Sequence, residues 1–233
     1  MARKAYPKYV ELTKQLAQQM TDVIVTYHEE KSVGSKPKST VNAADTGFST
    51  DAGLTSAQVR IKNFLECRRI KYLLHFTDKR NIASIKKYGL LSVSLLTQKR
   101  IAFVANDDAR YDGHEDGISL SISEENLYVK RSFVNRYPDR EYKTICIDAS
   151  ILYREPTRRI YCQTNAATIS GQKGSVFEDL EAMFAPEVCY TLHDQSEEYC
   201  FTRFGKVDNQ PTTPQAEILW LGTIPTEYLR FED

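Results

Sequence analysis

Glu217 is the residue whose surroundings most clearly favour chemistry, because it stands where a proline-containing loop meets an apolar run. The segment reads QPTTPQAEILW, and its apolar end, Ala216–Trp220, predicts a strand in which Gln215 and Glu217 share one face. A carboxylate at the start of a buried strand is costly unless it has a partner or a task. Held in place, such a carboxylate can stabilise a developing positive charge or act as a general base.

A second polar group follows the apolar run Tyr72–Phe76, which predicts another strand. His75 and Thr77 stand at its end, and Asn81 and the pair Gly89-Leu90 come soon after. A histidine at a strand edge can donate a hydrogen bond to a ligand hydroxyl while its other nitrogen is held by the backbone. The structural alternative is a histidine whose hydrogen bonds are all satisfied within the core.

A third group is a strand whose polar side chains alternate with apolar ones. Ser119, Ser121 and Ser123 fall on one face of the predicted strand Ile118–Ile122 and its end, so they form a strip of hydroxyls suited to an amide or a phosphate. Arg110, in the loop before this strand, could hold a pyrophosphate or a carboxylate, or neutralise the acids around it.

The same loop contains Asp112, His114 and Asp116, which are residue types that bind metals. Their spacing matches no recognised ligand pattern, so we expect no metal here and keep a metal-dependent nuclease only as an alternative. The cysteines form no CxxC pair and predict no zinc knuckle. We expect buried, reduced thiols at all five positions, which are Cys67, Cys146, Cys162, Cys189 and Cys200.

A fourth group contains Asn165, in the segment QTNAA, as a turn residue or a ligand residue. It is followed by a predicted helix, Val176–Phe184, whose apolar residues Leu180, Met183 and Phe184 favour a place in the core.

The elements that must position these residues predict an α+β fold with a mostly antiparallel sheet. A stretch rich in Ser, Thr, Gly and Lys, Glu30–Ser56, predicts a linker, so we divide the chain into a segment 1–56 and a domain 57–233. Further helices are predicted at Tyr9–Glu29, at Leu54–Arg68 with Thr55 or Ser56 as N-cap, at Arg80–Tyr88 ending at Gly89, and at Glu124–Val134. Further strands are predicted at Ile101–Val104, Lys143–Ile147, Ile160–Cys162 and Tyr199–Phe201.

Composition and charge limit the class of protein. With 233 residues, 41% of them hydrophobic, the chain suits a globular domain, and it has no apolar run long enough to cross a bilayer. The N-terminus lacks the apolar region of a secretory signal, so we expect a cytosolic protein without a membrane partner. The formal charge is zero, but Arg60–Arg100 is strongly basic. That segment predicts either a face for a few phosphates or solvated helix surfaces.

Taken together and in this order, the groups resemble the DarT family of bacterial toxins, which are nucleic-acid ADP-ribosyltransferases. The resemblance covers residues 60–230 and rests on YLLHFT with Asn81 and Gly89-Leu90, RYDG before Ser119-Leu120-Ser121, QTNAA, EAMF and PTTPQAE. The combination of the first and last of these segments is the specific part. The first sixty residues match no family that we can name.

The resemblance implies a split, mainly antiparallel sheet around an NAD⁺ cleft, preceded by N-terminal helices. It implies Glu217 and Arg110 as catalytic residues, and NAD⁺ as a substrate with no metal. The residues implied to bind NAD⁺ are His75, Phe76, Thr77, Asn81, Gly89, Leu90, Ser119, Ser121 and Asn165. The implied substrate-recognition loop is Asn209–Ala216, with Asn209, Thr212, Thr213 and Gln215 as its contact residues, and Tyr111, Phe201 and Phe204 are candidates for base stacking.

The resemblance also implies a toxin that modifies a base of single-stranded DNA and is neutralised by an antitoxin protein. A base is reached readily only when it is unstacked, which favours a single-stranded acceptor. Two alternatives remain open: the same chemistry on messenger RNA or tRNA, and a nucleic-acid-binding module without catalysis.

Overall fold

The computed structural model describes residues 53–105, 112–168, 170–191 and 198–231. The chain divides into two units, Met1–Thr50 and Asp51–Asp233, and every described residue belongs to the second. The predicted helix Tyr9–Glu29, most of the predicted linker, and the site candidates Arg110 and Tyr111 lie outside the described residues. In the part of the chain that is described, no helix is both long and apolar enough to span a membrane.

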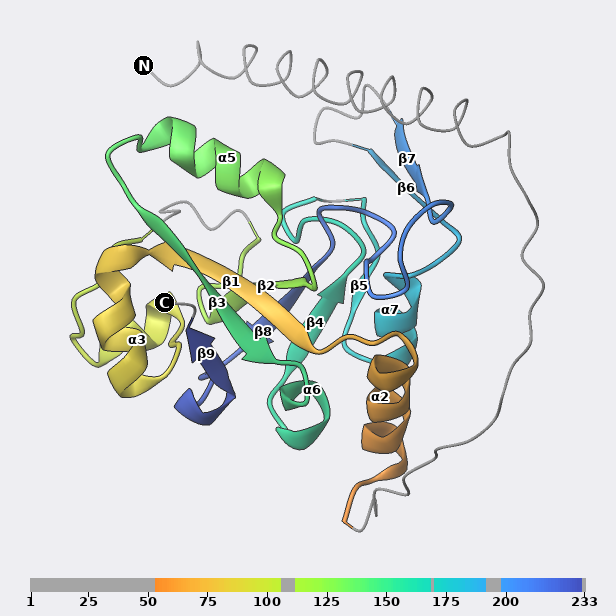
Figure 1. Cartoon of the computed structure of the whole chain (residues 1–233), viewed down its shortest axis with the longest axis horizontal. Coiled ribbons are helices and arrows are strands. Elements are labelled where there is room, and N and C mark those ends of the chain that lie inside the picture. The colour runs from red at the N-terminus through yellow and green to blue at the C-terminus, as the bar shows by residue number, and fades with distance from the viewer. Residues whose placement is uncertain (1–52, 106–111, 169, 192–197, 232–233) are drawn as a thin grey trace. The chain divides into compact units, whose positions relative to one another are not determined.

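A seven-stranded antiparallel sheet forms the centre of this unit (Figure 1). Its strand order is β5-β4-β8-β2-β1-β3-β9, and β6 and β7 pair separately as a two-stranded hairpin. The prediction of an α+β fold with a mainly antiparallel sheet is confirmed. The strands are β1 (Tyr72–Asp78), β2 (Gly117–Ile122), β3 (Tyr142–Asp148), β4 (Arg159–Cys162), β5 (Lys173–Gly174), β6 (Glu187–Thr191), β7 (Glu198–Thr202), β8 (Glu217–Leu221) and β9 (Leu229–Phe231).

Alternation along the strands separates the core from the site. In β8, Ile218 and Trp220 are fully buried in the main apolar core, whereas Leu219 belongs to a small second cluster with Cys162 and Ala166. Glu217 and Leu219 therefore point to the face opposite the main core.

The helices cover the core face through residues at helical spacing. α2 (Ser56–Cys67) buries Ile61 and Leu65, and the ring of its Phe64 packs edge-on against the ring of Phe184, with centroids 5.3 Å apart. Thr55 is its N-cap and forms a capping box with Gln58, which decides between the two caps that the sequence allowed. The other helices within the described residues are α3 (Ile82–Tyr88), α4 (Val93–Gln98), α5 (Leu127–Arg136), α6 (Ile151–Arg154), α7 (Phe177–Ala182) and the 3₁₀ turns η1 (Lys79–Asn81) and η2 (Thr226–Tyr228).

α3 ends where the sequence predicts. Gly89 follows it with φ of 80°, a conformation that favours glycine, and a Cβ built there would stand 2.5 Å from the carbonyl oxygen of Ile224. Leu90 then pairs with Ile224 in an isolated bridge. The segment Gly89–Leu90 is thereby held against the chain that follows β8.

One predicted strand does not form. The segment Ile101–Val104 is not in a strand, and at its last residue the side chain of Asn81 takes both backbone hydrogen bonds. Asn81 Nδ2 donates to the carbonyl oxygen of Val104 at 2.9 Å, and its Oδ1 accepts from the Val104 N–H at 2.8 Å. An amide side chain can satisfy both backbone groups of one residue, and no ladder is then needed.

Candidate active site

A cavity of about 340 Å³ lies beside β1, β2 and β8 and is closed by the segments around α3, α4 and α5. Its volume is typical of small-molecule sites. Ten of the residues that the sequence nominated line it: His75, Phe76, Thr77, Asn81, Gly89, Leu90, Ser119, Ser121, Asn165 and Glu217.

Glu217 is a buried carboxylate on the wall of this cavity, with 6% of its surface exposed. In the sheet it lies opposite Ser121 on β2 and opposite Cys162 on β4. Its Oε1 accepts a hydrogen bond from the backbone N–H of Ala166. Lys173 Nζ in turn donates to the carbonyl oxygen of Ala166, so the turn that contacts the carboxylate is itself anchored.

The negative charge of Glu217 affects the pKa of the neighbouring Cys162 thiol. Burial, and then the negative charge of Glu217, raise the pKa of the Cys162 thiol to about 12. Cys162 is fully buried and therefore stays a neutral thiol at physiological pH. A poorly solvated negative charge beside a ligand cavity is suited to stabilising a transient cation.

His75 is oriented by β2. Its Nδ1 lies 3.0 Å from the carbonyl oxygen of Ser119. A carbonyl only accepts hydrogen bonds, so Nδ1 carries the proton in this arrangement, and in a neutral ring Nε2 is the acceptor nitrogen. This is the backbone-held histidine that the sequence allowed, and it lines the cavity.

Two predicted site residues position the wall as well as line it. Asn81 Nδ2 also donates to Thr77 Oγ1 at 3.0 Å, in addition to its bonds to Val104. Both side chains are at least nine-tenths buried. Their polar atoms therefore hold β1 against the segment that precedes residue 106.

The serine strip is shorter than expected. Ser119 and Ser121 line the cavity, and Ser121 Oγ accepts from the Asn126 N–H at 3.2 Å, which leaves its hydroxyl proton available to donate. Ser123 lies beyond the end of β2 with φ of 61°, so the alternation stops before it and it does not line the cavity.

Part of the cavity wall is apolar, and its residues were not among the predicted site residues. Leu96, Phe103, Val129 and Phe133 line the cavity. The ring of Phe133 lies 6.0 Å, centroid to centroid, from that of Phe76. The spacing of Val129 and Phe133, four residues apart on a predicted helix, was a signal that could have identified this face.

Two of the predicted contact residues in the substrate loop are buried. The Thr212 and Thr213 side chains are at most 1% exposed, and their hydroxyls donate to the carbonyl oxygens of Ala185 and Gln163. These hydroxyls hold the loop to the fold, so a substrate contact through them would require the loop to open. Asn209 and Gln215 are half-buried and do not line the cavity, and Gln215 Nε2 is 3.4 Å from the Tyr190 hydroxyl.

Arg203 holds the same loop through hydrogen bonds to its backbone carbonyls. Its guanidinium donates to the carbonyl oxygens of Gln210, Val207 and Asp208 at 2.6, 3.1 and 3.0 Å. Gln210 Nε2 then donates to Glu124 Oε2 at 2.7 Å. The loop is thereby tied to the segment between β2 and α5, near the cavity rim.

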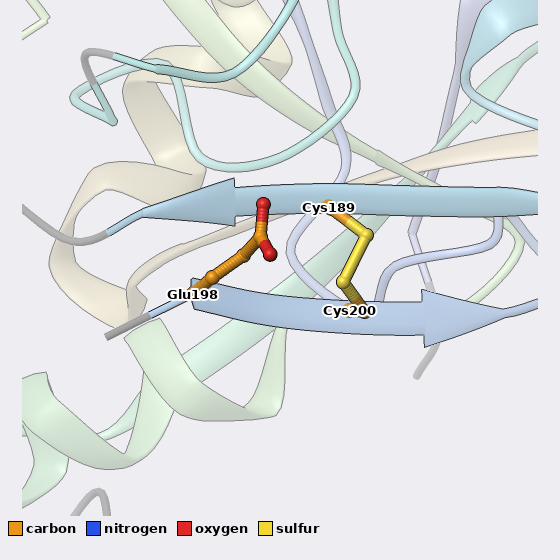
Figure 2. A group of neighbouring side chains, drawn as sticks. All are labelled: Cys189, Glu198 and Cys200. Atoms are coloured by element: carbon orange, nitrogen blue, oxygen red, sulfur yellow. A yellow bond between two sulfur atoms is a disulfide. The ribbon is translucent and has the colours of Figure 1, made fainter.

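The acidic loop does not assemble a three-ligand site within the described residues. The His114 N–H donates to Asp112 Oδ1 at 3.0 Å, and His114 Nδ1 is 3.8 Å from Asp116 Oδ1. In the part of the chain that the structure describes, a group of potential metal ligands does converge at Cys189, Glu198 and Cys200, whose ligand atoms lie within 4.8 Å of one another (Figure 2).

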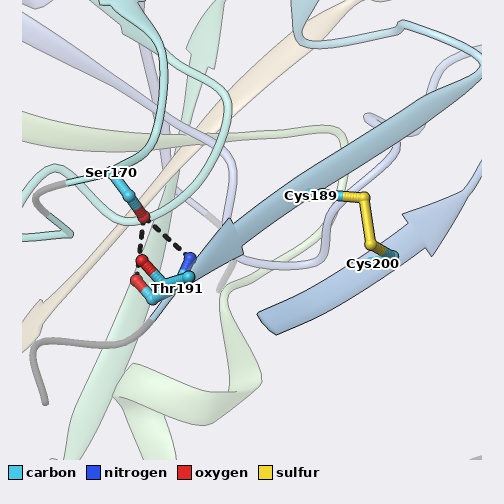
Figure 3. The surroundings of a disulfide bond; sticks show 4 residues. All are labelled: Ser170, Cys189, Thr191 and Cys200. Carbon is cyan, nitrogen blue, oxygen red and sulfur yellow. Dashed lines mark hydrogen bonds between the residues drawn. A yellow bond between two sulfur atoms is a disulfide. The ribbon is translucent and has the colours of Figure 1, made fainter. Parts of the chain in front are cut away.

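Cys189 and Cys200 form a disulfide, so the expectation of five buried, reduced thiols is wrong (Figure 3). The two residues are directly opposite in the β6–β7 hairpin, where cross-strand side chains come close enough to bond. Their sulfurs are bonded to each other and are not thiolate ligands in this state. Of the free cysteines, Cys162 is buried, whereas Cys67 is exposed and Cys146 half-buried.

The hairpin is connected to the site turn. Ser170 Oγ donates to the carbonyl oxygen of Thr191 at 2.9 Å and accepts from the Thr191 N–H at 2.8 Å (Figure 3). Ser170 belongs to the same β4–β5 connection as Asn165 and Ala166. The end of β6 is therefore attached to the loop whose backbone contacts Glu217.

No family model matches the sequence, and no curated protein matches it. Among solved structures, this chain is similar to one described as Thermosipho africanus DarTG in complex with ADP-ribose, with 14% sequence identity and a TM-score of 0.46. The superposition covers 70% of this chain and 44% of the other, so this chain spans less than half the length of that one. The function of this chain is accordingly inferred from the residues of its cavity.

Proposed function

We propose that this chain is an ADP-ribosyltransferase that moves ADP-ribose from NAD⁺ to a base of single-stranded DNA. The observation that carries the proposal is the buried Glu217 carboxylate on the wall of a cavity that also contains His75, Ser119, Ser121 and Asn165. These residues come from four separate segments of the chain, and the resemblance nominated all of them.

The chemistry is set by the bond that breaks. Nicotinamide leaves the anomeric carbon with the electron pair of the glycosidic bond, and positive charge develops on the ribose. A carboxylate beside this carbon stabilises the charged transition state more than the ground state, which lowers the barrier. A ring nitrogen or amino nitrogen of the acceptor base then bonds to the anomeric carbon, and its proton passes to Glu217 or to water.

The other cavity residues have supporting roles. His75 Nε2 is suited to accept a hydrogen bond from a ribose hydroxyl, because Nδ1 is committed to the Ser119 carbonyl. The Ser121 hydroxyl can donate to an amide oxygen such as that of nicotinamide. The apolar wall formed by Val129, Phe103 and Phe133 suits a planar ring. Arg110 is proposed to contact the phosphates of NAD⁺ or to assist catalysis.

A toxin role and a neutralising antitoxin are part of the same proposal and rest on the sequence resemblance. Transfer to RNA remains an alternative acceptor. A non-catalytic binding module predicts nucleic-acid binding without consumption of NAD⁺, and a metal-dependent nuclease predicts cleavage that chelators stop.

One experiment separates these cases. The purified chain is incubated with NAD⁺ and matched single-stranded DNA and RNA oligonucleotides, and the products are examined by mass spectrometry. We expect DNA that has gained one ADP-ribose, with release of nicotinamide. Modified RNA with unmodified DNA would transfer the proposal to RNA, and intact NAD⁺ with every oligonucleotide would overturn it.

A further inference from the structure

A second cavity, of about 600 Å³, lies next to the first. It is bordered by the segment 156–158 before β4, by Arg159 and Ile160 of β4, by β5 with Ser175, and by Leu219 and Leu221 of β8. Asp112 lines both cavities, and the turn Asn165–Ala167 separates them, since Asn165 and Ala167 line the first and Ala166 lines the second. The second cavity is therefore one short turn away from the Glu217 carboxylate.

The lining of this cavity carries more positive than negative charge. Arg158, Arg159 and Lys173 line it, against a single acid, Asp112. Among the described residues, none of these three cations forms an ion pair.

The contacts that they do make are with neutral oxygens. Arg159 donates to the Tyr161 hydroxyl at 2.8 Å and to the backbone carbonyls of Glu155 and Thr157, and Lys173 donates to the carbonyl of Ala166. Such bonds fix the side chains without cancelling their charge.

Arg158 is the cation most available to a ligand. It is exposed, and it precedes β4 in phase with Ile160, which also lines the cavity. Thr157 and Ser175 add hydroxyl donors to the same lining. Guanidinium, ammonium and hydroxyl groups around one cavity are the set that binds a phosphate.

We propose that the second cavity binds a phosphodiester group of the acceptor strand, next to the nucleotide whose base reaches Glu217. This inference rests on the proposed function and adds to it the place where the backbone of the acceptor is held. The acceptor base must approach the anomeric carbon from a side that the dinucleotide does not occupy. A phosphate held beyond the Asn165–Ala167 turn would set that approach.

The test measures binding without NAD⁺, so that it does not depend on catalysis. A fluorescent single-stranded oligonucleotide is titrated with the full chain at several salt concentrations, and its anisotropy is followed. The variant is Arg158→Gln, and the matched control is Arg230→Gln. Arg230 is also exposed, but it lies on β9, the edge strand farthest from β5 in the seven-stranded sheet. Loss of one phosphate contact reduces the slope of log K against log salt by about 0.7 for a single strand.

We expect Arg158→Gln to weaken oligonucleotide binding and to lower the salt slope by about this amount, with the KM for NAD⁺ unchanged. Arg230→Gln should bind as the wild type does. A second probe carries a neutral methylphosphonate in place of one phosphodiester, moved along the strand. At one position it should weaken wild-type binding but cause no further loss in Arg158→Gln, which couples that phosphate to that arginine.

Three results would overturn the inference. Equal salt slopes for the two variants would exclude a phosphate contact at Arg158. A raised KM for NAD⁺ with unchanged oligonucleotide binding would assign the cavity to the dinucleotide. Absence of oligonucleotide binding by the wild type would remove the acceptor strand. A coupled slope change in a chain that never consumes NAD⁺ would refute the proposed function and leave this binding site supported.

Discussion

Replacing Glu217 by glutamine changes charge with almost no change in shape. The glutamine side chain would keep a carbonyl oxygen that can accept from the Ala166 N–H, so the turn keeps its contact. What is lost is the negative charge at the cavity wall. At about 4 Å from a developing cation, and with an effective dielectric constant of about 20, that charge contributes about 4 kcal/mol. A loss of this size lowers the rate of nicotinamide release about 10³-fold.

The cost to folding should be far smaller. The buried hydrogen bond changes from a charged acceptor to a neutral one, which weakens it by about 1 kcal/mol. For a domain of this size that corresponds to a Tm lower by about 2–4 °C. The separation between a large loss of rate and a small loss of stability is the signature of a catalytic role.

The assay is nicotinamide release from NAD⁺, with and without oligonucleotide, in parallel with thermal unfolding. Glu178→Gln is the matched control. Glu178 lies on α7, is paired with Arg60 at 2.9 Å, and does not line the cavity. It should keep the wild-type rate. A folded Glu217→Gln variant that keeps the wild-type rate within about tenfold would exclude a catalytic role for this carboxylate.

Three further predictions concern titration and thiols. Arg80 holds the pKa of the buried Asp78 carboxyl below its ordinary value of 3.8. This carboxylate therefore stabilises the fold above pH 3.8, and its contribution is lost as the pH falls through the folded-state pKa. In urea titrations, the unfolding free energy of Asp78→Asn should fall less between about pH 7 and about pH 3 than that of the wild type, and an equal fall in both proteins would contradict this. Iodoacetamide at pH 8 should alkylate Cys67 and spare Cys162, as read by peptide mass, since the latter is buried and its thiol has a pKa of about 12. Cys189→Ser opens a loop with a sequence separation of 11 and should lower the unfolding free energy by up to about 3 kcal/mol, an effect that reductant should reproduce in the wild type but not in the variant.

Much of the fold could be predicted because local patterns dictate it. Apolar runs predicted β1 and β8, alternating apolar residues predicted β2, and the caps Thr55 and Gly89 indicated where helices begin and end. These signals depend on residues that are neighbours in the chain, and tertiary contacts did not override them. Boundaries moved by a few residues, as in α5, which begins at Leu127 after its N-cap Asn126 rather than at residue 124.

For the candidate site as well, some residues could be predicted from local spacing and others could not. Spacing along β8 placed Glu217 on the face away from Ile218 and Trp220, because alternation needs only the strand itself. His75, Asn165 and Glu217 line one cavity. Only the family resemblance had grouped them, because no local pattern relates segments that are so far apart in the sequence.

Local sequence patterns were enough to predict six of the nine strands that the structure describes, the caps Thr55 and Gly89, and the face of β8 on which Glu217 lies, but they missed β5, β6 and β9. Three features could be seen only once the chain was folded: the hydrogen bonds of Asn81 to the backbone of Val104, the pairing of Cys189 with Cys200, and the second cavity beside the turn that contacts Glu217. The physical reason is that each of these depends on which partner satisfies a buried or reactive group. Many partners are compatible with the sequence, and packing selects one.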